Sequence, residues 1–269
     1  MSTNRATITI AAAASLKNGL PDLITAFQLT GNTATVIKYG GSIALAEEIK
    51  TGDITPDVFL AASEDALDAA GSAKVDNTTK DSFIANSLVL IKNITGKTAL
   101  TGVTSFGTVT SGNIGSGHIW IADPDLAPAG EYAKDAFTRT SNWSYIWDKV
   151  KPGADNTLGS DVQDTLTKLV ADDNKPTPIP AVGVVYRSDY KNPPSIPLSN
   201  AFFVNYAPYD TNVQIIYYAA ALKNTLGDIK PEAASFVSFL VANATTYFTV
   251  VKGFRATNST APDEGDPIK

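Results

Sequence analysis

The stretch ATITIAAAASLKNGLPDLITAFQ, residues 6–28, decides the fold, because it places a buried strand directly before a helix. Its first part, residues 6–14, is a short apolar run of the length that a buried strand has. From Ser15 through Gln28 the pattern predicts a helix, since apolar residues recur at helical spacing at Leu16, Leu20, Leu23, Ile24 and Phe27. A strand that leads into a helix is the repeating unit of an α/β fold.

The same alternation of short apolar runs and helical segments continues along the chain. We predict further strands over 33–39, 58–61, 87–92, 118–122, 181–186 and 213–219. Helices are predicted to begin at Ser42, Ser63, Ala129, Asp161 and Pro231. Two Pro-rich stretches, 175–180 and 192–197, are typical of loops, and the polar tail after Phe254 is predicted to be disordered.

Length and composition limit the classes of protein to which this chain can belong. The 269 residues correspond to roughly two domains at about 150 residues each, and 43% hydrophobic residues are enough for a sizeable core. With 21 Lys and Arg against 27 Asp and Glu the net charge is −6, which argues against a nucleic-acid surface. The absence of Cys excludes thiolate metal sites and cysteine nucleophiles. No run approaches the ~20 apolar residues of a membrane-spanning helix.

An enzyme is one alternative to weigh. Any Ser-His-Asp triad would depend on the single histidine, His118, whose place at the start of a strand indicates a packed or surface residue instead. The letters of Ser188 to Lys191 match S-x-x-K, but this stretch follows a strand instead of opening a helix, and no companion motif is present. We therefore expect a protein without catalytic residues.

Several predicted helix starts offer a binding chemistry. Small or uncharged residues stand at the starts Ser15, Ser42, Ala129 and Val162. The first turn of a helix has about four backbone N–H groups without intrahelical partners and carries roughly half a positive charge. If such helix ends converge, they bind an anion without the help of Lys or Arg. The alternative for each serine is an ordinary N-cap, and the spacing along the chain leaves convergence open.

Five segments resemble the periplasmic molybdate-binding proteins of ABC transporters and follow one another in the order of that family. They are AAAASLKNGLPDLITAF (11–27), YGGSIALAEEIKTGDITPDVFLAASEDALD (39–68), NSLVLI (86–91), IADPDLAPAGEYAKDAF (121–137) and VGVVYRSDY (182–190). The resemblance covers most of the chain from Ile8 to about Tyr190, with a looser match over 213–254. The pattern DPxxxPAGxYAK at residues 123–134 is fairly specific to the family.

The resemblance implies a binding site for a tetrahedral oxyanion, molybdate or tungstate, held by hydroxyls, backbone amides and one tyrosine. Matched motif by motif, Ser15 and Ser42 would supply hydroxyl and amide donors, Ala129 and Val162 backbone amides, and Tyr186 a phenolic hydroxyl. The metal would then be bound only as its oxyanion, with no direct protein ligand. No resident cofactor is expected.

The resemblance also implies a fold and a setting. We expect a two-lobed α/β protein of the type II periplasmic-binding-protein fold, with ligand in the cleft between the lobes. One lobe would comprise residues 1–84 and 211–269, and the other residues 85–210. A protein of this family is not an enzyme, acts as a monomer, and delivers its cargo to the membrane permease of an ABC transporter. It is periplasmic or extracellular, with a lipid anchor left open; the opening MSTNR is typical of a mature chain whose export signal is absent.

Some features depart from the family pattern. Tyr39-Gly40-Gly41 stands where the family has a serine-rich turn, so Ser42 is the hydroxyl donor there, and the insertion KPTPIP weakens the assignment of Val162. Glu131 has two interpretations, an additional ligand or a first-turn acid that the helix dipole favours. The aromatic segment 192–210 has no counterpart in the family.

The identity of the ligand has alternatives as well. Sulfate or phosphate, the other tetrahedral oxyanions, would suit similar donors, although a site of donors alone offers no acceptor to the proton of hydrogen phosphate. A small carboxylate normally recruits Arg, and Arg187 is the arginine next to the expected site. The sequence does not separate molybdate from tungstate.

Overall fold

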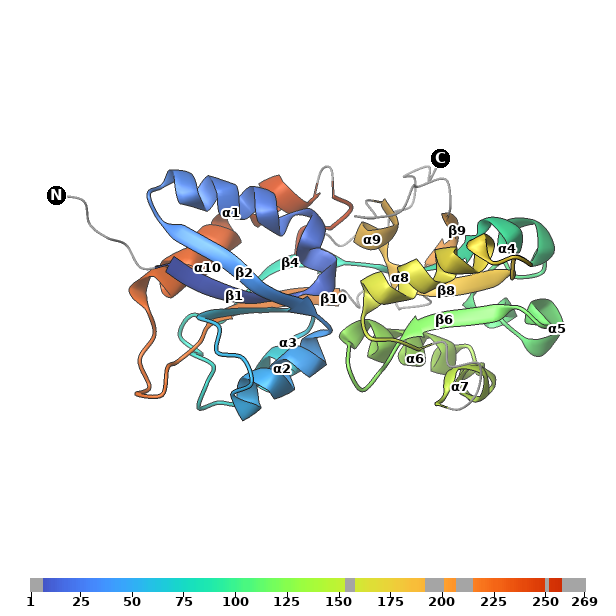
Figure 1. Cartoon of the computed structure of the whole chain (residues 1–269), viewed down its shortest axis with the longest axis horizontal. Helices are drawn as coiled ribbons and strands as arrows, with labels where there is room; N and C mark the ends of the chain where they lie inside the picture. The colour runs from blue at the N-terminus through green and yellow to red at the C-terminus, as the bar shows by residue number, and fades with distance from the viewer. Residues whose placement is uncertain (1–6, 153–157, 192–200, 207–214, 250–251, 258–269) are drawn as a thin grey trace. The chain divides into compact units, whose positions relative to one another are not determined.

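The computed structural model describes residues 7–152, 158–191, 201–206, 215–249 and 252–257. The chain divides into two compact units (Figure 1). The first is formed by Met1–Asn86 and Ile215–Thr257, and the second lies within Ser87–Gln214. The chain leaves the first unit after Asn86 and re-enters it at Ile215.

The first unit is built on a five-stranded mixed sheet of order β2-β1-β3-β10-β4. Its strands are β1 (Thr7–Ala13), β2 (Thr33–Gly40), β3 (Val58–Ala61), β4 (Asp81–Asn86) and β10 (Ile215–Ala221). Strands β1, β2 and β3 run parallel, and β10 is antiparallel to both β3 and β4. The parallel strands therefore end at one common edge, where β-to-α connections lie.

Helices cover both faces of this sheet (Figure 1). One face carries α1 (Leu20–Leu29) and α10 (Pro231–Ala244), which meet where the rings of Phe27 and Phe236 pack edge to face, their centroids 5.1 Å apart. The other face carries α2 (Ser42–Thr51) and α3 (Glu64–Asp68). A π-helical turn over Thr245–Thr249 extends α10.

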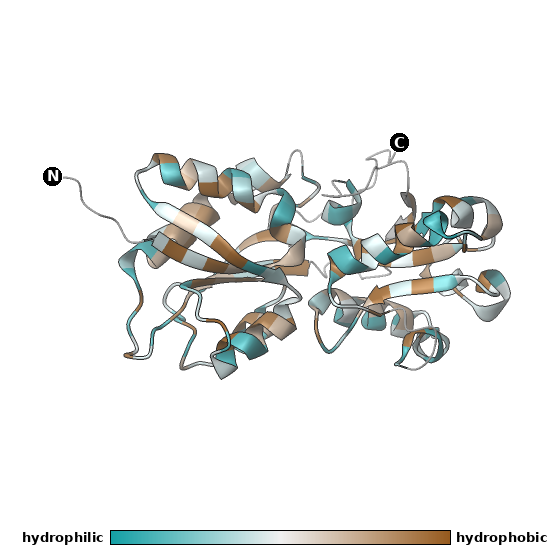
Figure 2. Cartoon of the chain, in the orientation of Figure 1, coloured by the Kyte–Doolittle hydropathy of each residue, from teal (hydrophilic) through white to brown (hydrophobic). Residues whose placement is uncertain are grey.

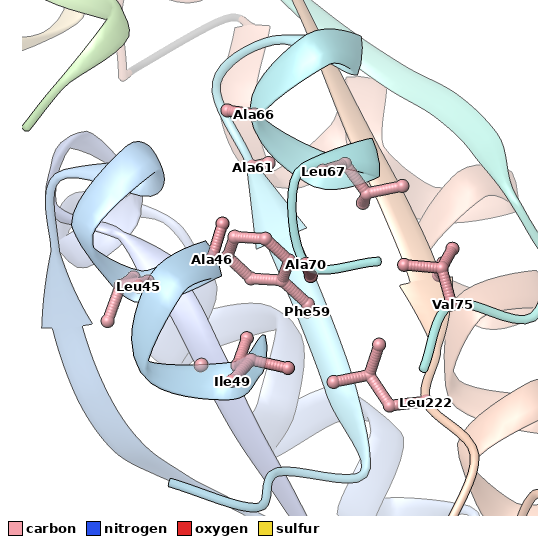
Figure 3. Packing of buried hydrophobic residues seen from close by; sticks show 12 residues of the cluster. Leu45, Ala46, Ile49, Phe59, Ala61, Ala66, Leu67, Ala70, Val75 and Leu222 are labelled. Carbon is pink, nitrogen blue, oxygen red and sulfur yellow. The ribbon is translucent and has the colours of Figure 1, made fainter. Parts of the chain in front are cut away.

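The core beneath α2 and α3 consists of small and branched side chains around one aromatic ring (Figure 3). The ring of Phe59 from β3 points toward Ala46 of α2 and Ala70 beyond α3, and Leu222 closes the cluster below it. Strand residues are predominantly hydrophobic, while the helices carry hydrophilic residues on part of their surface (Figure 2). This pattern follows from a sheet that is buried on both faces.

The second unit repeats the plan with a sheet of order β7-β6-β8-β5-β9. The strands are β5 (Leu88–Asn93), β6 (His118–Ala122), β7 (Leu158–Gly159), β8 (Ala181–Tyr186) and β9 (Ala201–Tyr206). Strands β6, β7 and β8 are parallel, and β5 is antiparallel to β8 and β9. The helices are α4 (Ile94–Ala99), α5 (Ser111–Ile114), α6 (Pro128–Arg139), α7 (Trp143–Val150), α8 (Val162–Ala171) and α9 (Arg187–Lys191), with 3-10 turns at Phe106–Thr108 and Asp172–Asn174.

The helix predicted from Ser15 through Gln28 is wrong in its first part. Ala14–Asn18 form a 3-10 helix, and the α-helix begins only at Leu20. The reason is Pro21, which in a helix starting at Ser15 would lie in the interior, where its ring clashes with the preceding turn. After a reset at Gly19, Pro21 falls in the first turn of α1, where proline is well tolerated.

Three further predictions need correction. Ser188 to Lys191 were expected to follow a strand without opening a helix, but they lie in α9. The tail after Phe254 was predicted to be disordered, yet Arg255 pairs through its backbone with Ala85 of β4 at 2.8 Å in both directions. The last predicted strand, 213–219, continues to Ala221 in β10, and its first two predicted residues lie outside the described residues.

The aromatic segment 192–210 contains β9, which pairs with β5. Residues 192–200, 207–214 and 258–269 lie outside the described residues. The helices of the described part include none with both the length and the apolar character of a membrane span.

Candidate functional site

Ser15 and Ser42 lie at the same edge of the first unit's sheet. The parallel strands β1 and β2 pair Ala13 with Gly40, and each serine follows its strand by two residues. Both are about 1% exposed although both are polar. Buried hydroxyls require hydrogen-bond partners, so their contacts indicate what they can still bind.

The hydroxyl of Ser15 belongs to a buried chain of hydrogen bonds. Its Oγ lies 2.9 Å from the phenolic oxygen of Tyr217 on β10, and Nδ2 of Asn86 on β4 donates to that same phenolic oxygen at 3.2 Å. Ser15 is therefore no N-cap, because no side chain caps the 3-10 helix in which it lies. Neither Tyr217 nor Asn86 was singled out from the sequence.

Ser42 is the first residue of α2, one position after the N-cap Gly41. Its Oγ accepts a hydrogen bond from the backbone N–H of Ala62, at 3.0 Å, just beyond the end of β3. The ordinary N-cap alternative is wrong here as well. A serine oxygen that accepts a scaffold N–H still has its own hydrogen to donate.

Tyr39, at the end of β2, adds a phenol near this edge. Burial raises the pKa of Tyr39 to about 12, so its hydroxyl stays protonated throughout the physiological range. The ammonium group of Lys17 lies 5.7 Å from the centre of the Tyr39 ring. This contact places one cation beside this edge of the sheet.

Ala129 is the second residue of α6, which follows β6 after a short loop. Pro128 before it has no N–H, while the N–H groups of Gly130 and Glu131 both reach the carbonyl of Ala127, at 2.9 and 3.4 Å. Ala129 thus carries the first-turn amide that has no acceptor within its own helix.

Gly130 lies between Ala129 and Glu131 in the first turn of α6, and its contacts explain why this residue is glycine. A Cβ there would stand 2.4 Å from the carbonyl oxygen of Ala122 and 2.5 Å from the nitrogen of Pro124. Glycine is thus required because the start of α6 packs directly on the end of its own strand. Glu131 lies in the first turn of α6, as the dipole interpretation expects.

Val162 is the first residue of α8, and the N-cap before it is Asp161. The carboxylate of Asp161 accepts the N–H groups of Gln163 and Asp164, at 2.8 and 2.9 Å. The amide of Val162 is left as the first-turn amide without an acceptor in its helix, the same situation as at Ala129. The Asp161 charge nevertheless offsets part of the positive potential of this helix end.

Tyr186 is the last residue of β8 and is 2% exposed. The α9 residues that follow it include Arg187, Ser188 and Asp189, all buried. The side chain of Gln163 in α8 donates to the carboxylate of Asp189, which joins the first turn of α8 to α9. Since Ser188 is fully buried, the S-x-x-K match offers no accessible nucleophile.

Ala129, Val162 and Tyr186 share the carboxyl edge of the second unit's sheet. They follow or end β6, β7 and β8, which are parallel and paired through Ala122–Gly159 and Trp120–Gly183. The five predicted residues therefore form two groups, one at the carboxyl edge of each sheet. The donor groups of these five residues are all neutral hydroxyls or amides.

His118 lies at the opposite, amino edge of the second sheet. The buried carboxylate of Asp172 contacts His118 Nδ1 at 2.9 Å, accepts the indole N–H of Trp120 at 2.7 Å, and pairs with Lys175 Nζ at 2.7 Å. Of the two alternatives for His118, a packed or a surface residue, the structure shows the packed one, in a cluster that joins the chain after α8 to β6.

We predict that Asp172→Ala lowers the free energy of unfolding by about 3 kcal/mol, because the indole N–H and the basic partners of a buried carboxylate lose their acceptor. Urea unfolding followed by tryptophan fluorescence measures the change. The matched control is Asp148→Ala, which removes an exposed pair with Lys151 and should cost under about 1 kcal/mol. Equal losses in the two variants would contradict the structural role of Asp172.

A cavity of about 300 Å³ lies at the amino edge of the first unit's sheet, away from Ser15 and Ser42. Its wall includes Asp57, whose carboxylate accepts from Thr9 and pairs with Lys230 at 2.9 Å. In the described part of the chain, no three His, Asp or Glu side chains gather as a metal site would require.

Comparison with known proteins agrees with this architecture. A molybdate-binding protein of Escherichia coli, ModA, is 30% identical over 186 residues, which cover 68% of this chain and 66% of that protein, slightly less than two thirds of its length.

Two solved structures share the fold. The sulfate-binding protein SubI of Mycobacterium tuberculosis has a TM-score of 0.69 at 16% identity, covering 94% of this chain and 88% of its own. The periplasmic molybdate-binding protein of Azotobacter vinelandii has a TM-score of 0.61 at 16% identity, covering 87% and 92%. The expected type II periplasmic-binding-protein fold is confirmed.

A family model described as bacterial extracellular solute-binding protein matches residues 8–255, which is most of the chain. Members of this family are non-catalytic, solute-binding components of transporters, in agreement with the expectation that the chain is not an enzyme. Two α/β units that each present neutral donors at one sheet edge fit such a role. The chain belongs to the bacterial extracellular solute-binding protein family.

Proposed function

We propose that this chain captures a tetrahedral oxyanion, molybdate or tungstate, and delivers it to the permease of an ABC transporter. The ligand would be held by the hydroxyls of Ser15 and Ser42, the amides of Ala129 and Val162, and the hydroxyl of Tyr186. In this proposal the two lobes, residues 1–84 with 211–269 and residues 85–210, close over the anion as one monomer outside the cytoplasm. The metal reaches the protein only as the centre of its oxyanion.

The observation that carries the proposal is that the candidate donors keep a hydrogen that their own scaffold does not use. The backbone N–H groups of Ala129 and Val162 have no acceptor within their own helices. The Ser42 oxygen already accepts the N–H of Ala62, so the Ser42 hydroxyl can donate its hydrogen to a ligand. A fully deprotonated dianion accepts at every oxygen, so a site made only of donors suits it. Each charge-assisted hydrogen bond contributes about 1.5–3 kcal/mol.

The choice of molybdate rests on the 30% identical relative that bears that name and on the motif DPDLAPAGEYAK. Sulfate is the second candidate, since the SubI structure is named for sulfate, although at 16% identity that likeness shows the fold alone. Both anions are fully deprotonated in neutral buffer, so the fit of the cavity to the size of the anion has to separate them.

Isothermal titration calorimetry of the purified chain tests the proposal. We expect one molybdate or tungstate per chain, with sulfate at least about 100-fold weaker, which corresponds to about 2.7 kcal/mol. Hydrogen phosphate should bind more weakly still. Sulfate binding as tight as molybdate binding would move the proposal to its second candidate, and the absence of binding by any of these anions would refute it.

A further inference from the structure

Asn86, Tyr217 and Ser15 form a chain of buried hydrogen bonds, called the relay below. The three side chains are buried and come from β4, β10 and the 3-10 helix after β1. The relay runs from Asn86 Nδ2 to the Tyr217 oxygen at 3.2 Å and on to Ser15 Oγ at 2.9 Å. These contacts lie wholly within the first unit.

The direction of this chain of hydrogen bonds follows from the chemistry of its members. An amide NH₂ group only donates, so the phenolic oxygen of Tyr217 is an acceptor toward Asn86. A phenol is a stronger donor and a weaker acceptor than an alcohol, because its lone pair is delocalised into the ring. Either hydroxyl can donate in the pair formed by Tyr217 and Ser15. With one lone pair of the phenol engaged by Asn86, the stronger acidity of the phenol favours Tyr217 as the donor to Ser15 Oγ.

We infer that Asn86 and Tyr217 are positioning residues that make Ser15 a hydrogen-bond donor toward the ligand and thereby select fully deprotonated oxyanions. This inference rests on the proposed function and deepens it. Because the Ser15 oxygen accepts from Tyr217, its hydrogen is available to a bound anion. Aligned hydrogen bonds polarise one another, which strengthens the last donor of the chain. In the same way, the N–H of Ala62 donates to Ser42 Oγ, so the Ser42 hydrogen is also available to a ligand.

The sharpest test reverses the relay. In Asn86→Asp the introduced carboxylate only accepts, so Tyr217 turns its hydrogen toward it, and Ser15 must donate to Tyr217. Ser15 then offers the ligand a lone pair, which suits the proton of hydrogen phosphate and repels molybdate oxygens. In mildly alkaline buffer both anions carry two negative charges, so general repulsion by the new carboxylate cancels in their affinity ratio.

We expect Asn86→Asp to shift the ratio of molybdate to hydrogen phosphate affinity by at least about tenfold toward phosphate, measured by competition calorimetry. Tyr217→Phe keeps the ring packed on Phe83 and Phe254 but removes the phenolic oxygen. It should shift the ratio in the same direction by a smaller factor, about threefold. Circular dichroism and thermal unfolding verify that each variant is folded.

Two control variants carry the same kinds of substitution at positions outside the relay. Tyr218→Phe removes the hydroxyl of the neighbouring tyrosine, which packs on the core beneath α2 and α3, and Asn224→Asp adds a charge in a loop at the amino edge. Both should leave the ratio unchanged. In a Ser15→Ala background, Asn86→Asp should no longer shift the ratio, because no hydroxyl remains to carry the polarity.

The outcomes distinguish a failure of the proposed function from a failure of the relay. If the wild-type chain binds none of these anions, the proposed function fails and the relay has no ligand to serve. If the wild-type chain binds molybdate, an unchanged ratio in folded Asn86→Asp and Tyr217→Phe overturns the relay alone. A shift in the ratio that persists in the Ser15→Ala background also overturns the relay, since it would then arise from general distortion of the first unit.

Discussion

Replacing Ser15 and Ser42 together by alanine is expected to weaken molybdate binding by about three orders of magnitude. Each substitution removes one charge-assisted hydrogen bond worth about 1.5–3 kcal/mol, or about 10- to 150-fold in affinity. Both hydroxyls are buried and both oxygens lie within hydrogen-bond distance of a scaffold group, so neither is replaced by water without cost.

The single variants separate affinity from stability. Ser42→Ala also leaves the Ala62 N–H without its acceptor, which should lower the free energy of unfolding by about 1–3 kcal/mol. Ser15→Ala leaves Tyr217 paired with Asn86 and should destabilise less. Ser238→Ala, at an exposed position of α10, is the control and should change neither quantity. Calorimetry and urea unfolding measure them, and an unaltered affinity in the double variant would remove both serines from the site.

Val162→Pro is expected to weaken molybdate binding by about 10- to 100-fold through the loss of a single backbone N–H. Proline is favoured at the first position of a helix, so α8 itself should persist. The residue before it, Asp161, has an extended backbone with φ −158° and ψ −177°, outside the α region that a following proline disfavours. The variant therefore deletes a donor while leaving the helix in place.

Val162→Ala is the matched control for this amide. It trims a buried side chain but keeps the N–H, so it should reduce stability by about 1–2 kcal/mol and leave affinity nearly unchanged. The two variants should thus differ in calorimetry more than in thermal unfolding. If alanine weakens binding as much as proline does, the site depends on packing around Val162 and the amide has no role in it.

Local sequence signals predicted most of the strands and helices. The strand at 118–122, the strand at 181–186 and the helix start at Ser42 were placed correctly, because a buried parallel strand is a continuous apolar run and a helix repeats its apolar residues at a fixed spacing. The edge strand β9 was missed, since its aromatic residues come soon after the Pro-rich stretch 192–197 and show no clear alternation.

The chemistry at the helix starts was only partly predictable. The sequence pointed to small residues after strands, and the first-turn amides of Ala129 and Val162 are placed as a helix start requires. It did not show that Asp161 occupies two amides of α8 or that Gly130 serves helix packing. These outcomes depend on side-chain rotamers and close contacts, which spacing does not encode.

By itself, the sequence determined the α/β class, the neutral character of the candidate donors and the family, because periodicity, composition and motif order are properties of the linear chain. Only the tertiary structure decided the environment of those donors. Ser15 and Tyr217 are 202 positions apart, and Asn86 and Tyr217 are 131 apart, yet they form one chain of hydrogen bonds. Strand order brings β1, β10 and β4 into one sheet, and a hydrogen bond forms only between groups that the fold has already brought within about 3 Å.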